Sequence, residues 1–194
     1  FVTLSGSTAV ADANTVSGKT TGTVTATITE GDVTTLKTLN ETTNAYTLVI
    51  TDTTVAAADL ETLDGLTTVA VDASNVTVLT GSISAVTDIY AANTAGTISG
   101  LGNEAVTISD SVSVAVASLN TLDGKTTGQI NASSIQSITG IAADLNTAYA
   151  SNGITGLGNE AVTLSDTSLA TTVLNTLDGN TTGTVNAATV TTLT

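Results

Sequence analysis

The sequence predicts a solenoid of repeated strand–short helix coils, an α/β or β-solenoid in which parallel strands stack in a ladder. Residues 98–153 begin ISGLGNEAVTISD, and from residue 154 the chain starts again as ITGLGNEAVTLSD. Self-similarity at a period of about 55 residues is typical of arrays whose units pack on their neighbours. Short runs of alternating β-branched residues, separated by runs with helical spacing, recur within each copy and complete the prediction.

The strand signal is a short alternating run that ends in Asp or Asn. Runs of this kind, rich in Val, Ile and Thr, predict half-buried strands. We expect the strands to stack in register as one parallel ladder around Ile50, Val71, Ile108, Ile130, Leu164 and Val185, starting at Val24. The runs lie at residues 23–25, 48–52, 69–72, 106–110, 129–131, 162–166 and 184–186.

The helix signal lies between these runs, at residues 55–63, 116–122 and 141–149, where Ala and Leu recur at helical spacing. Asp, Ser or Thr at the end of a strand is a suitable N-cap for the helix that follows. Gly65, Gly124 and Gly179 follow the helical runs in the phrase Leu-Asp-Gly, where we expect a left-handed residue to end each helix. Each is followed by a Thr-Thr pair.

The repeats divide the chain approximately into residues 1–47, 48–97, 98–153 and 154–194, which we interpret as one continuous array and as a window of a longer chain. Successive strand runs lie about 21–25 residues apart in short coils and about 33–37 in long ones, within solenoid periods. The long coils carry an additional piece, for example residues 148–158, which we expect to map to one face of the array.

Composition restricts the partners. The chain has 17 acidic residues against three lysines, a net charge of −14, and no Cys, Met, His, Trp or Pro, and 45 of its 194 residues are threonine. Nucleic-acid binding requires Lys or Arg to neutralise phosphates, and no stretch approaches the roughly 20 apolar residues of a membrane span. We therefore expect neither nucleic-acid binding nor membrane insertion. A chain without Cys and with only three lysines is redox-inert and offers trypsin few sites, which suits the outside of a bacterium.

Two short motifs resemble nucleotide-binding loops but are better explained as turns. Gly124-Lys125-Thr126 lacks the glycine that a phosphate-binding loop requires five positions earlier, where Leu119 stands. Gly156-Leu157-Gly158-Asn159 and its copy at residues 100–103 lack the third glycine of a dinucleotide fingerprint and precede a strand instead of a helix.

The acidic and amide residues after the strands form a predicted ladder, which is the candidate site. Structural capping is the simpler role, and the alternative is calcium binding by oxygen ligands from adjacent coils. The calcium candidates are Asp52, Asp72, Asp110 and Asp166. Asn131 and Asn186 continue this ladder, and Asp64, Asp123 and Asp178 form a second one at the helix ends. The Gly-Gly-x-Gly-x-Asp pattern of calcium-binding β-rolls is absent.

No catalytic constellation is visible. The chain has no His or Cys, so proton shuttling near neutral pH and thiol chemistry have no carrier. Paired carboxylates could hydrolyse glycosides, but these acids recur once per repeat, which suits a structural position better. We expect a protein that is not an enzyme.

The phrases ADLETLDG at residues 58–65, LNTLDG at 119–124 and TLSD at 163–166 resemble the long, Thr-rich repeats of giant secreted or cell-surface proteins of bacteria, notably marine cyanobacteria. That resemblance implies an extracellular structural, adhesive or S-layer-like role. LNTLDG also resembles repeats of phage tail fibres, in which the helix phrase restarts sooner than it does here.

We therefore expect a segment of a surface fibre, sheath or adhesin that associates with itself into fibres and contacts surface glycans or the cell envelope. A phage fibre shaft, which would trimerise in solution, is the alternative. A third hypothesis is an ice-binding solenoid, since Thr and Ser at 107, 109, 163 and 165 are expected to point outward. Its regular Thr-x-Thr pattern is evident only at residues 23–27.

Overall fold

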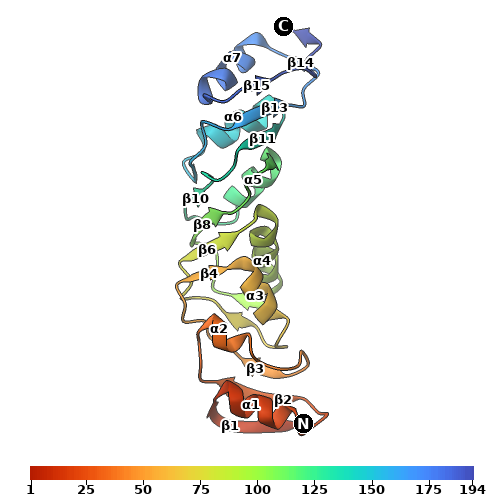
Figure 1. The fold of residues 1–194 in the computed structure, drawn as a ribbon, viewed down its shortest axis with the longest axis vertical. Coiled ribbons are helices and arrows are strands. Elements are labelled where there is room, and N and C mark those ends of the chain that lie inside the picture. Colours follow the sequence, from red (N-terminus) through yellow and green to blue (C-terminus); the bar gives the residue numbers. More distant parts are fainter. The chain divides into compact units, whose positions relative to one another are not determined.

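Parallel strands alternate with short helices along the whole chain, as Figure 1 shows for a computed structural model that describes all 194 residues. The chain forms two compact units, one of residues 1–80 and 85–104 and the other of residues 81–84 and 105–194. The α/β character predicted from the sequence is confirmed, because helices alternate with strands and every strand pair is parallel.

The first unit contains most of the elements up to residue 99, although α4 begins in residues assigned to the second unit. In chain order they are β1 (Val2–Thr8), α1 (Val10–Ser17), β2 (Val24–Ile28), α2 (Val33–Leu36), β3 (Ala45–Thr47), β4 (Thr54–Ala56), α3 (Ala57–Asp64), β5 (Val71–Asp72), β6 (Val78–Gly81), α4 (Ile83–Ala95) and β7 (Ile98–Ser99). Its strands pair as β1-β2-β3, β4-β6 and β5-β7.

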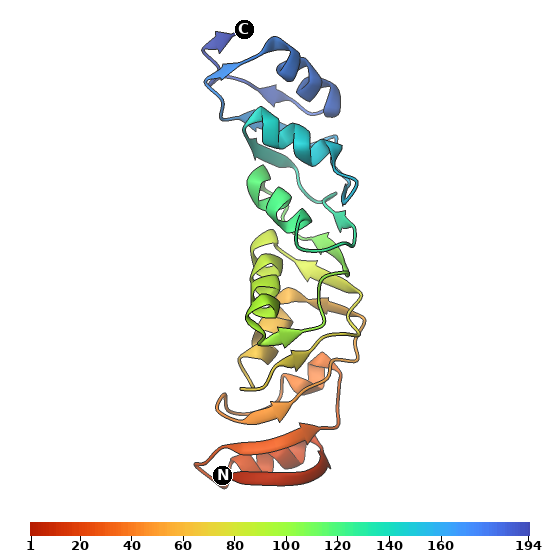
Figure 2. The ribbon, with the colours of Figure 1, turned by 180° about the vertical axis from the view of Figure 1, so that it is seen from behind.

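The second unit contains the remaining elements, and Figure 2 shows the ribbon from behind. They are β8 (Ala105–Ile108), β9 (Ser113–Ala115), α5 (Val116–Asp123), β10 (Ile130–Asn131), β11 (Ser137–Gly140), α6 (Ala142–Ala150), β12 (Ile154–Thr155), β13 (Ala161–Leu164), β14 (Ser168–Leu169), α7 (Thr171–Asn180), β15 (Val185–Asn186) and β16 (Thr192–Leu193). They pair as β8-β10-β12, β9-β11-β13-β15 and β14-β16.

Paired residues in the second unit are separated by a nearly constant length of chain. Ser113 pairs with Ser137 and Ser137 pairs with Ala161, so the two steps along the chain are equal. The first unit is less regular, because the step from Val2 to Val24 is shorter and the step from Val71 to Ile98 is longer. Chain distance, rather than similarity between the runs, therefore decides which strands are neighbours.

The expected single ladder is wrong for this reason. Ile130 pairs with Val106 and Ile154, whereas the strand of Leu164 pairs with β11 and β15 in a different sheet. The run at residues 48–52 forms no strand and contributes one parallel bridge, from Val49 to Asp72. Some successive alternating runs are separated by more residues than lie between two paired strands. A strand that the pattern did not predict pairs at the position between such runs.

That other strand lies in the piece expected to be an insertion. Residues 148–158 contain the end of α6 and the strand β12, whose Ile154 pairs with Ile130 one step earlier. In the first unit Ile98 of β7 pairs in the same way with Val71. The strands β7 and β12 are too short for alternation to be recognised in the sequence.

The core is built from rows of inward aliphatic side chains. Val114, Ile138 and Val162 are paired across three strands and all are buried. Val106 and Ile130 form part of a second buried row with Ile154. Parallel strands with β-branched inner residues stack in this way because the side chains fit the pleated surface.

The helices of this chain are too short or too polar for any of them to cross a membrane.

The glycines after the helices are not left-handed. Gly65 and Gly124 have φ of −72° and −76°, within the right-handed helical region, and their amides donate to carbonyls of the preceding turn. Gly179 lies inside α7. The expected left-handed stop is therefore wrong: Gly65 and Gly124 add one more right-handed residue to the last turns of α3 and α5, and α7 continues through Gly179.

Candidate functional site

Four carboxylates each accept a hydrogen bond from the amide of the first residue of a helix. Asp52 Oδ2 lies 2.7 Å from Val33 N, Asp110 Oδ2 2.7 Å from Ile83 N, and Asp166 Oδ2 2.8 Å from Ala142 N. Glu30 Oε2 lies 3.0 Å from Val10 N. The sequence predicted caps for the helix that follows each strand, whereas the helix capped is the one 19–27 residues earlier.

The chain needs these distant caps because the residue before several helices has no acceptor. Ala9 and Ile141 precede α1 and α6, and neither side chain can accept a hydrogen bond from the helix. The first amides of a helix have no partner within it, so an acceptor from elsewhere satisfies them and also faces the positive end of the helix dipole. The helix α2 has in addition a local cap, from Asp32 to Thr35 N at 2.8 Å.

The other members of the ladder close local turns. Asp72, Asn131 and Asn186 each accept, through Oδ1, the amide of the residue two positions later, at 2.9–3.1 Å. These are Asx turns, in which a short side chain substitutes for a backbone carbonyl. The Ser74 hydrogen bond lowers the pKa of Asp72, because it stabilises the ionised carboxylate.

The acids at the helix ends are used unequally. Asp64 Oδ2 accepts from the Thr97 hydroxyl at 3.1 Å, and Asp123 Oδ2 accepts from the Ser151 hydroxyl at 2.7 Å. Asp178 is exposed and makes no such contact. Two of the three therefore anchor a segment that lies 28–33 residues further along the chain.

The calcium candidates are not brought together. No group of three or more acidic side chains lies close enough to hold a metal ion anywhere in the chain. Asp52, Asp110 and Asp166 each contact a different helix, and Asp72 closes its own turn. Their oxygens satisfy backbone amides of the protein, which is the capping role of the two that the sequence left open.

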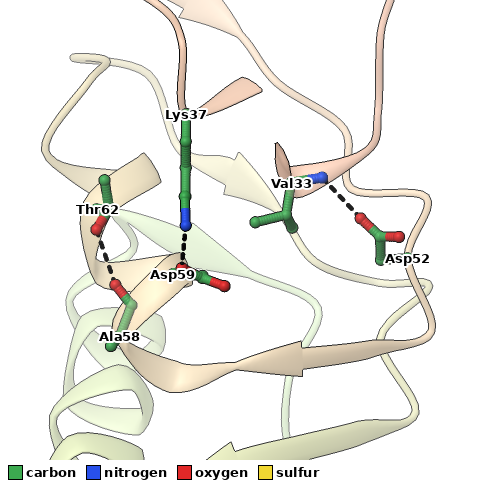
Figure 3. Close-up of polar contacts among 6 residues, drawn as sticks. All are labelled: Val33, Lys37, Asp52, Ala58, Asp59 and Thr62. Carbon is green, nitrogen blue, oxygen red and sulfur yellow. Dashed lines mark hydrogen bonds and ion pairs between the residues drawn. The ribbon is translucent and has the colours of Figure 1, made fainter. Parts of the chain in front are cut away.

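One ion pair accompanies the cap in the first unit. Lys37 Nζ lies 2.5 Å from Asp59 Oδ1, joining the end of α2 to α3, beside the Asp52–Val33 hydrogen bond (Figure 3). Both side chains are about one-third exposed. A pair this accessible contributes only about 0.2–1 kcal/mol, and less at high salt.

The recurring Thr-Thr pairs, unexplained by the sequence, form a second set of contacts. The hydroxyls of the first threonines accept the amide of the residue two positions later, at 2.9–3.1 Å, in Thr20, Thr67, Thr126 and Thr181. Thr67 and Thr181 also donate to the backbone carbonyls of Tyr46 and Glu160, 21 residues earlier. These pairs therefore close their own turns, and Thr67 and Thr181 also fasten the turn to an earlier segment.

Two buried glutamates are the site that sequence reasoning missed. Glu160 is 1% exposed and accepts the amides of Gly158 and Asn159 at 2.8 and 3.1 Å, as well as the Tyr149 hydroxyl. Burial and the Glu160 carboxylate raise the pKa of Tyr149 well above its ordinary value. The tyrosine therefore stays protonated and donates to a carboxylate that burial would otherwise disfavour.

Glu104 occupies the same environment in the first unit. It is 1% exposed, Tyr90 Oη donates to its Oε1 at 2.5 Å, and the amides of Gly102 and Asn103 donate to it at 2.9–3.1 Å. The glycine-rich turns that resemble dinucleotide loops thus direct their amides at the chain's own carboxylate. The recurrence of Gly-Leu-Gly-Asn-Glu was the available signal, since Glu follows the turn in both copies.

The third tyrosine joins a neutral buried cluster. Asn44 is 1% exposed, accepts the Val24 amide at 2.8 Å, and donates to Ser17 Oγ and Tyr46 Oη at 2.9 Å. Burial raises the pKa of Tyr46. All three tyrosines of the chain therefore hold a buried polar side chain, and no buried side-chain nitrogen or oxygen lacks a partner.

One small pocket of about 150 Å³ lies in the first unit and is lined by residues that include Asp64, Thr67, Val69, Gly96 and Thr97. Well-formed ligand sites are usually about 300–1,000 Å³ and strongly apolar, so this pocket is smaller than such a site.

Comparison with known proteins yields no relative. No protein-family model matches the chain. No curated protein and no solved structure matches it either.

Proposed function

We propose that this chain is a segment of a non-enzymatic extracellular repeat protein that forms part of a surface fibre, sheath or S-layer-like assembly, and that within each unit it winds as a solenoid. The observation that carries the proposal is the constant step of the parallel pairs, which is the same from Ser113 to Ser137 as from Ser137 to Ala161. A chain that returns to the same position after a fixed length adds one coil per step.

Three kinds of contact join successive coils in this proposal. Backbone ladders and buried rows such as Val114–Ile138–Val162 supply the first two. The carboxylate caps supply the third, since Asp166 fixes the start of a helix one step earlier. Each coil is thus secured to its neighbour through core, backbone and helix end, as a fibre under tension requires.

The surface supports an extracellular role. Seventeen acids and three lysines keep the chain soluble and discourage polyanionic partners. Self-association and contact with surface glycans or the cell envelope remain the proposed partners. In this proposal the short strands and the helix caps hold the coils together, and the outer faces of the coils make the adhesive contacts.

The solenoid can be tested by deletion in the whole chain. Removing residues 113–136 takes out one whole step, after which Ile154 stands as far from Val106 along the chain as Ile130 does in the parent. We expect both this variant and the parent to unfold cooperatively. Removing residues 113–124 places partners half a step apart and is expected to abolish the cooperative transition in urea.

Equal behaviour of the two deletions would contradict the solenoid. The location is tested separately on intact cells of the source organism with an antibody against this chain. Surface labelling, lost after mild external protease, is the expected result. Labelling that requires permeabilised cells would overturn the extracellular proposal.

A further inference from the structure

The sheet β1-β2-β3 presents one buried and one exposed face. Val24, Ala26 and Ile28 of β2 are buried, together with Tyr46 of β3. The alternate residues point the other way and are exposed. These outward residues are Thr3 and Ser7 of β1, Thr25 and Thr27 of β2, and Thr47 of β3.

The register aligns these hydroxyls in two rows. In the first row Thr3 is paired with Thr25 and Thr25 with the half-buried Ala45, so this row holds two hydroxyls. In the second row Ser7, Thr27 and Thr47 are paired and hold three. Neighbouring strands lie about 4.8 Å apart, and residues two apart on one strand about 6.6 Å. The strand β1 bulges between the rows, at a position where Gly6 has φ of 79°, and this brings Ser7 into line with Thr27.

The hydroxyls of these five residues bind no protein group, whereas those of some outward threonines in the second unit do. In the second unit the outward Thr139 and Thr155 donate to the carbonyls of Val114 and Ile130 on the neighbouring strand, at 3.4 and 3.2 Å. In the β1-β2-β3 sheet no such bond forms, so the hydroxyls are available to an external partner. None of the residues in these three strands is charged, although the chain carries 17 acids.

We propose that this hydroxyl face of β1-β2-β3 binds ice, a function beyond the structural role. Ice is an uncharged lattice of hydrogen-bonding oxygens, and its surface matches a face that carries hydroxyl and methyl groups in rows but no charge. Water molecules that bridge hydroxyls held in such rows would occupy repeating positions, and many ordered bridging waters lose little entropy. Tyr46, the aromatic residue of these three strands, is buried, so this face offers no ring on which a sugar could stack.

The test measures thermal hysteresis and ice-crystal shape in solutions of the whole chain. The parent is expected to shape ice crystals and to separate the melting and freezing points. Thr27→Lys places a charged, strongly hydrated group at the centre of the second row and is expected to abolish both effects. Thr27→Tyr keeps strand propensity but places a bulky ring on the face. It should abolish both effects as well, because the ring would prevent ice from contacting the neighbouring hydroxyls.

Thr34→Lys is the matched control, because Thr34 is an exposed threonine of α2 outside the sheet. It adds the same charge and is expected to retain the activity of the parent. Absence of ice shaping by the folded parent would overturn the proposal, and so would full activity of folded Thr27→Tyr. Either result leaves the structural proposal intact, since that rests on the coil step and the cell surface.

Discussion

The carboxylate of Asp166 accepts a hydrogen bond of 2.8 Å from the amide of Ala142, the first residue of α6, which lies 24 residues earlier in the chain. The first amide of α6 therefore gains its acceptor only when the chain that follows the helix has folded back beside it. A cap supplied at this distance converts a local feature of one helix into a contact between successive steps.

Loss of this cap should destabilise the chain measurably. Asp166→Ala leaves the Ala142 amide without its acceptor and removes a negative charge from a helix N-terminus, which is expected to cost about 0.5–2 kcal/mol in the free energy of unfolding. The measurement is urea denaturation followed by circular dichroism. Asp178→Ala, at an exposed acid without a partner, is the control, and equal effects of the two variants would refute the capping role.

The Tyr149–Glu160 pair should behave as a coupled unit. Tyr149→Phe removes one donor from a carboxylate that is 1% exposed and is expected to cost about 1–3 kcal/mol. Glu160→Gln removes the charge from the same cluster, so the double variant should cost less than the sum of the two single ones. Strict additivity in the urea-derived free energies would show that the two side chains do not cooperate.

Stability should fall at alkaline pH. The pKa of Tyr149 and that of Tyr46 are raised in the folded chain, so that above about pH 10 the unfolded state loses tyrosine protons that the folded state keeps. The contribution of the two tyrosines to stability is therefore complete below about pH 10 and declines as the pH rises further. The decline should be shallower in Tyr149→Phe, as measured by urea midpoints from about pH 9 to the highest accessible pH, and an unchanged slope would contradict it.

Two glycines that look alike in the sequence should respond in opposite directions to alanine. A Cβ at Gly183 would lie 2.1 Å from the backbone oxygen of Glu160, so Gly183→Ala is expected to cost about 1–3 kcal/mol. Gly179 lies inside α7 with nothing within 4 Å of a Cβ, so Gly179→Ala should stabilise the chain by about 0.4–1 kcal/mol. Thermal melts of both variants decide the signs, and destabilisation by Gly179→Ala would contradict its place inside the helix.

Calcium removal separates the two roles of the acidic ladder. Because Asp52, Asp110 and Asp166 are occupied by helix amides, chelator at constant ionic strength should leave the melting temperature unchanged. Monovalent salt should change it modestly through screening of the net charge of −14. A large fall with chelator, reversed by calcium but not by sodium, would instead support metal binding.

Only part of the candidate site could be predicted from the sequence. The positions of Asp52, Asp110 and Asp166 were singled out correctly, because an acid after each alternating run is visible as a pattern. Their partners were assigned to the wrong helix, since a carboxylate reaches whichever amide lies nearest in space. Glu104 and Glu160 were missed because an isolated glutamate is ordinarily exposed, and only their surroundings reveal the tyrosine and amides that permit burial.

The sequence by itself determined the α/β character, the parallel direction of the strands and the identity of many inward residues. These follow from local periodicity and from β-branched side chains that favour a buried pleated surface. The tertiary structure alone decided which strands pair, because the number of residues that one step takes depends on how the helix and turns of each coil fold: Ile130 pairs with Ile154 instead of Leu164. It also decided that the helices are capped from a distance, since the amides of Val33 and Ala142 meet their carboxylates only once the chain has folded back.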